Sequence, residues 1–211
     1  VIALANSAFY SPQQTVVSLR SAVIVLGTDI VSRLASTTLA RTLMSPASGA
    51  DEALWQHSFQ VGSAAKLIAE THRLCASPLA FTAGLLHDIG LLAMSRLQVD
   101  PSILDHALVG AEVAAELGLP EDLCQAIRLH HCADWNANAS AVLAASVYLA
   151  NQISQESDEQ TTEQPSHCDE LAGAMTVLQL KPGDLDHFNI ALPARIAEIE
   201  KSVALPEVGA G

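Results

Sequence analysis

The sequence has few basic and few aromatic side chains, and these shortages exclude several classes of protein. Ten Lys and Arg stand against 23 Asp and Glu, which gives a formal net charge of −13. A protein that binds the phosphates of nucleic acid needs a basic surface, so this balance argues against a nucleic-acid partner. Aromatic residues make up 4% of the 211 residues, whereas apolar residues make up 50%. A core rich in alanine and leucine favours packed helices over a β-sandwich.

Several common signatures are also missing. There is no P-loop, no Gly-x-Ser-x-Gly and no Gly-x-Gly-x-x-Gly. Four cysteines form no Cys-x-x-Cys pair, so we expect reduced thiols in a cytoplasmic protein. The first residues lack a basic region and a long apolar run, so we predict no signal peptide and no membrane insertion. The chain does not begin with Met, so we expect it to be part of a longer protein, with other domains left open.

Helical periodicity runs along most of the chain and predicts an all-α, compact bundle. Residues 1–153 are expected to form one helical domain, with short N-terminal helices over 1–45 and a denser core over 51–153. The predicted core helices cover 54–74, 78–97, a segment from His106 to Leu117, one with Pro120 in its first turn, and 139–153. Residues 154–170 are acidic and predict a flexible loop. The last segment, 171–211, is expected to form helices that pack on the same domain.

One group of side chains consists of residue types that bind metal ions. Five histidines and one aspartate recur at inward-facing helical positions: His57, His87, Asp88, His106, His130 and His131. Imidazole and carboxylate are ligands suited to Mn, Fe, Zn or Ni. A single inward histidine is more often a hydrogen-bonded core residue, but five on four helical segments are costly to bury without a metal or partners. The sequence therefore predicts a site for one or two divalent ions. The other three histidines, His72, His167 and His187, are expected on the surface.

The order of these residues, with Gly84-Leu-Leu-His-Asp-Ile-Gly90 at its centre, resembles the HD superfamily of metal-dependent phosphohydrolases. Other segments resemble its HDOD branch, the HD-related output domain. These segments are Ala5-Asn-Ser-Ala-Phe-Tyr10, Ser18-Leu-Arg-Ser-Ala-Val23 followed by Leu26-Gly27, Leu54-Trp-Gln-His-Ser58 and Leu119-Pro120. The resemblance covers residues 1–153 and implies a helical fold and a role in bacterial signal transduction. HDOD domains have mostly been assigned no enzymatic activity.

By this resemblance, the six residues match the ligand positions of the dinuclear HD-GYP phosphodiesterases. Three departures weaken the likeness to an active enzyme. Leu91 stands where the pattern has a lysine that would meet a substrate phosphate, and Asn151 stands where it has a last carboxylate ligand. The Gly-Tyr-Pro segment is missing, and the connection from Gln98 to Ile103 is short. An amide at 151 can still coordinate through oxygen, without the negative charge.

Three hypotheses follow. The preferred one is a regulatory output module that contacts a protein partner and keeps a His/Asp metal site, with Asn151 as a further ligand. The alternative is a metal-dependent phosphohydrolase or phosphodiesterase acting on a nucleotide or cyclic dinucleotide, with Asp88 as the catalytic carboxylate that bridges two ions or orients the attack. The third is a helical bundle whose histidines hydrogen-bond one another and bind nothing. The sequence leaves enzymatic activity undecided, and the three departures argue against it. Binding of a nucleotide ligand also stays open.

Overall fold

A computed structural model of the chain describes residues 1–7, 10, 12, 15–43, 49–131, 140–156 and 168–203. These residues form eleven helices and no strand, which confirms the all-helical prediction. The helices are α1 (Ile2–Ala5), α2 (Leu19–Leu26), α3 (Thr28–Leu43), α4 (Gly49–His72), α5 (Ser77–Leu86), α6 (Ile89–Leu97), α7 (His106–Glu116), α8 (Glu121–Leu129), α9 (Ala141–Glu156), α10 (Cys168–Val177) and α11 (Pro182–Val203).

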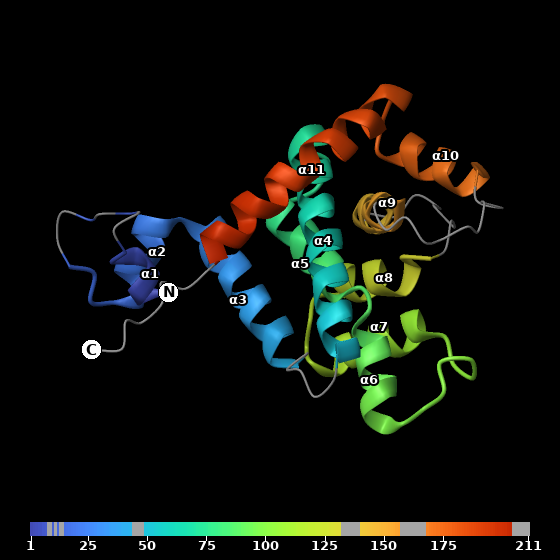
Figure 1. The fold of residues 1–211 in the computed structure, drawn as a ribbon, viewed down its shortest axis with the longest axis horizontal. Helices are drawn as coiled ribbons and strands as arrows, with labels where there is room; N and C mark the ends of the chain where they lie inside the picture. Colours follow the sequence, from blue (N-terminus) through green and yellow to red (C-terminus); the bar gives the residue numbers. More distant parts are fainter. Residues whose placement is uncertain are drawn as a thin grey trace.

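Helix α4 is the centre of the fold. Its residues from Val61 to Ala69 are buried on every side of the helix, because α5, α9 and α11 all pack against it (Figure 1). Small side chains such as Ala64 and Ala65 let these neighbours come close. The C-terminal helices belong to the same core, because Leu178, which directly follows α10, and Phe188 of α11 are part of its main apolar cluster.

The crossing of α4 and α5 depends on two glycines. A Cβ atom at Gly84 would lie 2.8 Å from the Cα of Gly62 and 2.8 Å from the carbonyl oxygen of Val61. These contacts are with backbone atoms, which cannot rotate away as a side chain can. Gly84, the first residue of the Gly-Leu-Leu-His-Asp-Ile-Gly motif, therefore sets how closely the helix before the His-Asp pair packs on the central helix.

Helices α1 and α2 form a separate small core with the first part of α3, set apart from the main body in Figure 1. Asn6 joins its pieces: its Nδ2 donates to the carbonyl of Val16 at 2.8 Å, and its Oδ1 accepts from the Val16 N–H at 2.8 Å. Ser18 caps α2 by accepting from the Ser21 N–H at 3.0 Å. Gly27 ends α2 at φ +80°, a conformation that favours glycine.

A buried lysine ties the small N-terminal core to the main body. Lys66 of α4 is 3% exposed, and its Nζ lies 2.7 Å from Oε1 of Glu70 and 3.4 Å from Oδ1 of Asp29 in α3. Glu70 also pairs with Arg195 of α11. A buried ammonium is tolerated only when it is paired, so this network fixes α3, α4 and α11 relative to one another.

The structure corrects several boundaries expected from the sequence. The predicted helix over 78–97 is two helices, because the chain turns at His87 and Asp88. Pro120 is the N-cap of α8 and stands just before its first turn. Helix α9 continues to Glu156 and α10 begins at Cys168, so both ends of the predicted 154–170 loop are helical. The rest of that segment, 157–167, lies outside the described residues.

Other expectations concern single side chains. His72 is half-buried against the ring of Phe188, with centroids 6.0 Å apart, so the prediction of a surface residue is wrong there. His187 is exposed as predicted. Cys75 and Cys124 are free thiols. His167, Cys132 and the side chain of Cys168 lie outside what the structure describes.

By length and composition alone, Ser77–Leu97 is the one stretch in the described part of the chain that is apolar enough to cross a membrane. It consists of α5 and α6 here, and 67% of its apolar window is buried inside the fold. The core helix of a soluble protein passes the same test. The packing of α5 against α4 therefore accounts for this apolar character.

The helix crossing gives a first prediction. Gly84→Ala would press a methyl group onto the backbone of α4, so we expect the free energy of unfolding to fall by about 2–4 kcal/mol. Gly183→Ala is the matched control, because a Cβ there meets nothing within 4 Å. Alanine has a higher helix propensity than glycine, so the free energy of unfolding of this variant should stay equal or rise by up to ~1 kcal/mol. Urea unfolding followed by circular dichroism measures both; equal stability of the two variants would contradict the role of Gly84.

Candidate metal centre

The predicted histidines and Asp88 come from four separate parts of the fold and meet at one place. His57 lies on α4, His87 ends α5, Asp88 precedes α6, and His106 is the first residue of α7. His130 and His131 follow the end of α8. Two overlapping groups have ligand atoms within 4.8 Å of one another: His57, His87 and Asp88 in one, and Asp88, His106, His130 and His131 in the other.

The turn between α5 and α6 brings the His-Asp pair into the cluster. His87 still has helical backbone angles, whereas Asp88 leaves them at φ −100° and ψ 17°. Asp88 stands at the N-cap of α6, where an aspartate usually accepts from a backbone N–H of its own helix. Its side chain makes no such bond. The carboxylate is turned toward the histidines instead.

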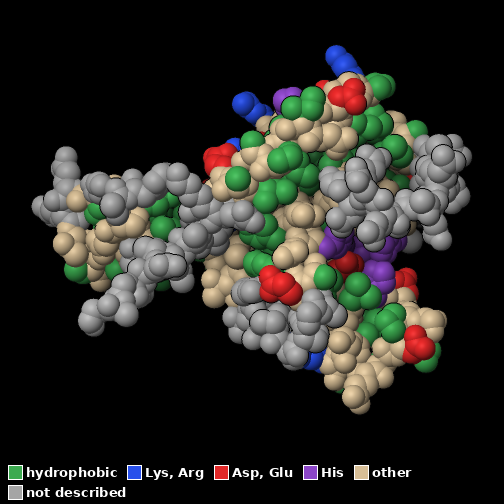
Figure 2. All heavy atoms as spheres, viewed as in Figure 1, with side chains coloured by type: hydrophobic (Ala, Val, Ile, Leu, Met, Phe, Trp, Pro, Cys, Tyr) green, Lys and Arg blue, Asp and Glu red, His purple; other side chains and the backbone are tan. Residues whose placement is uncertain are grey.

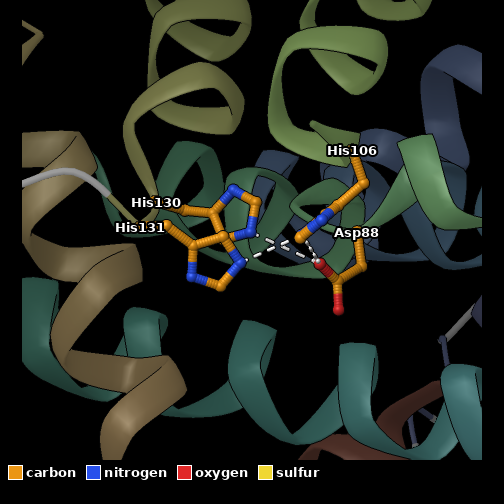
Figure 3. A group of neighbouring side chains, drawn as sticks. All are labelled: Asp88, His106, His130 and His131. Carbon is orange, nitrogen blue, oxygen red and sulfur yellow. Dashed lines mark hydrogen bonds and ion pairs between the residues drawn. The ribbon is translucent and has the colours of Figure 1, made fainter. Parts of the chain in front are cut away.

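The two oxygens of Asp88 face different histidines. Oδ2 lies 3.2 Å from Nε2 of His87 and 3.8 Å from Nε2 of His57. Oδ1 lies 3.3 Å from Nε2 of His106 and 3.3 Å from Nε2 of His130. Figure 3 shows the Asp88 carboxylate below His106, facing the His130–His131 pair across the site. Asp88 is thus the shared member of both groups, in the position of a bridging carboxylate.

The backbone fixes the tautomers of the two most buried rings. Nδ1 of His87 donates to the Gly84 carbonyl at 2.8 Å, and Nδ1 of His130 donates to the Ile127 carbonyl at 2.6 Å. A carbonyl oxygen can only accept, so each Nδ1 carries the proton and the neutral ring has its lone pair on Nε2. This arrangement of a ring N–H on a carbonyl is usual for metal-binding histidines.

Both Nε2 atoms are buried and lack a partner with hydrogen-bond geometry among the described residues. Each nevertheless faces a carboxylate oxygen of Asp88 at 3.2 or 3.3 Å. Two lone pairs facing a carboxylate repel one another unless a cation lies among them, as a proton or a metal ion. The residues present therefore fit a divalent metal ion, since imidazole and carboxylate are suited to Mn, Fe, Zn and Ni.

His106 and His131 complete the second group. Their Nε2 atoms lie 2.9 Å apart, so one ring must donate a proton to the other when no metal is bound. Two nitrogen ligands about 2.1 Å from one ion, at a right angle, lie about 3.0 Å apart, so the spacing also suits a shared ion. These rings are partly open, with 24% of the His106 side chain accessible.

Glycines and a helix cap position His106. A Cβ at Gly90 would lie 1.9 Å from the His106 carbonyl oxygen and 2.7 Å from the Gly110 nitrogen, so α6 and α7 touch through backbone. Asp105 caps α7 by accepting from the Ala107 N–H at 2.8 Å. The last glycine of the Gly84–Gly90 motif is therefore needed to bring His106 next to Asp88.

The charges of the cluster are strongly coupled. Burial would raise the pKa of Asp88, but the electrostatic interaction with His87 and the close approach of the His106 and His130 rings hold that pKa well below its usual range. The hydrogen bond to Asp88 raises the pKa of His106 against the opposing effect of burial. Burial, aided by the neighbouring imidazoles, lowers the pKa of His131 to about 4. Without metal, the carboxylate thus favours a proton on His106, while His131 stays neutral near pH 7.

The cluster is open to solvent on one side. His87 and His130 are completely buried, whereas 25% of the His57 side chain is accessible. Figure 2 shows histidine side chains gathered with an acidic group in a hollow on the face that carries α6 and α7. A small ligand or ion can therefore reach the cluster without opening the fold.

Asn151 and Leu91 behave differently from the six clustered residues. Asn151 is buried in α9, and its Oδ1 accepts from Nε2 of Gln155 in the same helix at 3.3 Å. No contact with the histidines is described for it, so its place as a ligand stays a prediction. Leu91 is half-buried in the first turn of α6. It offers no charge to a phosphate group beside Asp88.

Some supporting residues were not found from the sequence. The carbonyls of Gly84 and Ile127 orient the buried rings, and both lie three residues before a histidine. That spacing is a recognisable signal, because a histidine at the end of a helix can reach the carbonyl one turn back. Gly110, which meets Gly90, gives no such signal, since the contact joins two different helices.

Comparison with known families agrees with this geometry. Residues 54–171, more than half of the chain, match the HD domain family, and residues 1–103 match the HDOD domain family. The chain belongs to the HD domain family, and within it to the HDOD type. No curated protein sequence matches the chain.

Solved structures with a similar fold include an HDOD domain protein with unknown function from Geobacter sulfurreducens, with a TM-score of 0.67, 24% identity and coverage of 96% of this chain and 79% of that one. A candidate phosphohydrolase from Shewanella amazonensis SB2B has a TM-score of 0.61 and 23% identity, over 96% and 81% of the two chains. The MmoQ response regulator from Methylococcus capsulatus has a TM-score of 0.53 and 19% identity, over 89% and 82%. At these identities the likeness shows the fold alone.

The titration of His106 gives a second prediction. A metal must replace the proton that Asp88 holds on this ring, so metal binding should release about one proton below the raised pKa of His106. The dissociation constant for Mn²⁺ or Zn²⁺ should then rise about tenfold per pH unit as the pH falls through that range. Calorimetry in buffers of different ionisation enthalpy, from about pH 8 to about pH 5, measures both quantities. A constant affinity over that range would show that His106 is not displaced from its proton.

Proposed function

We propose that the chain is a regulatory output module of a signalling protein, in which the histidine cluster holds one or two divalent metal ions. The membership in the HDOD type supports a role in signalling. The observation that carries the metal site is the pair of buried Nε2 atoms that face Asp88 without a hydrogen bond. A divalent ion held there would supply Lewis acidity and a fixed positive charge.

In this proposal the cluster acts as a tie between helices. Helix α7 packs chiefly against α6 and α8, on the edge of the fold, whereas His57 belongs to the central helix α4. Asp88 lies between them and faces His57 with one oxygen and His106 with the other. A cation bound in the cluster would therefore fix α7 relative to α4. The position of the exposed surface of α7 would then differ between the occupied and the empty cluster.

The surface of α7 supports contact with another protein. Leu108 and Leu117 are 45% and 50% exposed, and with Val113 they line a shallow apolar groove on the outer side of the helix. Exposed apolar surfaces rimmed by polar residues are typical of interaction sites. We therefore propose a protein partner in the cytoplasm; the net charge of −13 argues against nucleic acid.

Hydrolysis of a phosphate ester is the second candidate function. It is favoured by one observation, the bridging position of Asp88 between two histidine groups. The half-buried Leu91 argues against it, because no described cation stands beside Asp88 to meet a substrate phosphate. If the protein were active, Asp88 would be the catalytic carboxylate and a nucleotide or cyclic dinucleotide the expected substrate.

Metal content tests the proposed site. Untagged protein should contain nearly one or two equivalents of Mn, Fe, Zn or Ni per chain by inductively coupled plasma mass spectrometry. Asp88→Asn keeps the shape but removes the charge shared by both groups, so we expect at least a ~10-fold loss of affinity. His187→Ala, an exposed histidine of α11, should leave the metal content unchanged. Metal-free protein that takes up none of these ions would leave only a hydrogen-bonded histidine cluster.

A hydrolysis assay separates the two functions. With Mn²⁺ or Fe²⁺ present, we expect purified protein to cleave bis(4-nitrophenyl) phosphate and cyclic dinucleotides no faster than its His87→Ala variant. The physical reason is the apolar side chain at Leu91, which adds no positive charge for a substrate phosphate beyond that of the metal. Turnover that a chelator and His87→Ala both abolish would instead establish the phosphohydrolase.

A further inference from the structure

A second cavity lies away from the histidine cluster, among α4, α9 and α11. Its volume is about 330 Å³, and its lining residues are Gln60, Ser154, Asn189, Leu192, Pro193 and Ile196. This size lies at the lower end of the range for small-molecule sites. The described lining residues carry amide, hydroxyl and apolar groups, and none of them is charged. The cavity therefore suits an uncharged ligand with both apolar surface and hydrogen-bonding edges.

Two of its polar side chains, Gln60 and Asn189, carry amide groups. In the part of the chain that the structure describes, the amides of Gln60 and Asn189 make no hydrogen bond to another protein group. Each amide offers both a donor and an acceptor. Ser154 differs, because its hydroxyl donates to the carbonyl of Ala150 at 2.9 Å. The cavity thus presents amide groups from two different helices, α4 and α11, that bond to no described residue.

A proline inside α11 adds a third polar group. Pro193 has no N–H, so it cannot donate to the carbonyl of Asn189, four residues earlier in the helix. Both residues line the cavity. A proline in the interior of a helix costs stability, and the acceptor that it frees belongs to a residue of the cavity lining. Acceptor and donor groups are therefore gathered around an apolar wall formed by Leu192, Pro193 and Ile196.

We propose that this cavity binds a nucleobase, as part of a nucleoside or larger ligand. A flat heterocycle would lie on the apolar wall and pair its edge with the amides, since Asn and Gln can form two hydrogen bonds to a base edge. Among the described lining residues there is no cation that would pair with a phosphate group, so the uncharged base is the part of such a ligand that this lining fits. Gln60 follows His57 by three residues, so the cavity and the cluster draw on neighbouring positions of the same helix α4.

Nucleoside titrations of the full chain test this site without involving a metal. Adenosine, guanosine, cytidine and uridine are each titrated and followed by protein NMR. At least one should bind saturably, with a dissociation constant on the order of 0.1–1 mM. Gln60→Leu and Asn189→Leu should each weaken that binding about 5- to 10-fold, the loss expected for one neutral hydrogen bond. Pro193→Ala should weaken it as well, because the alanine restores a backbone N–H that can donate to the Asn189 carbonyl.

Controls separate this site from the metal centre. Gln125→Leu, on α8 and outside the cavity lining, should leave nucleoside binding unchanged. Metal content should be the same in all four variants, so a failure here would not bear on the metal site. Absence of saturable binding by all four nucleosides would overturn the proposal. So would binding that none of the cavity variants weakens, or equal binding of naphthalene, which has the shape but no hydrogen-bonding edge.

Discussion

The buried carboxylate of Asp88 is the constraint on which the rest of this structure depends. It is surrounded by imidazoles from α4, α5, α7 and the end of α8, all with Nε2 within 3.8 Å. An isolated charge at this depth would be costly, so the helices must meet where they can supply a compensating cation. A proton on His106 meets that demand in part, and a divalent ion would meet it for both oxygens at once. Stability and function therefore impose the same arrangement, since the cluster cannot be loosened without exposing an unpaired charge.

Close helix packing makes this meeting possible. Gly84 lets α5 touch α4, and Gly90 lets α6 touch α7 at His106. The Gly84–Gly90 motif is thus a packing motif as well as a ligand motif, because Gly84 brings α5 and His87 against α4, and Gly90 brings α6, which follows Asp88, against α7 and His106. The N-terminal segments that resemble the HDOD family have structural explanations of the same kind. Asn6 joins α1 to the segment at Val16, Ser18 caps α2, and Gly27 ends it.

The sequence predicted the all-helical fold and the six clustered residues because both leave local signals. Inward-facing histidines repeat at helical spacing, and the His-Asp pair with its glycines is distinctive. It did not predict the break at His87–Asp88, because apolar residues continue on both sides from Leu85 to Leu92 and resemble one helix. It also missed the network of Lys66, whose partner Asp29 is far away in sequence, and the ring–carbonyl bonds, which require the folded backbone. Such contacts depend on how helices pack, and no single segment encodes them.

The retained histidines and the missing lysine are consistent once their physical roles are separated. The histidines compensate a buried charge and join α4 to α7, so they are needed whether or not a substrate is ever turned over. A lysine at position 91 would serve only a substrate, since it would add a charge where Asp88 already has four imidazoles. Leu91, which stands at this position, offers no positive charge to a substrate phosphate. Among the described residues, a cluster that could bind a cation has no further positive side chain beside Asp88, which is why we propose a regulatory role ahead of hydrolysis.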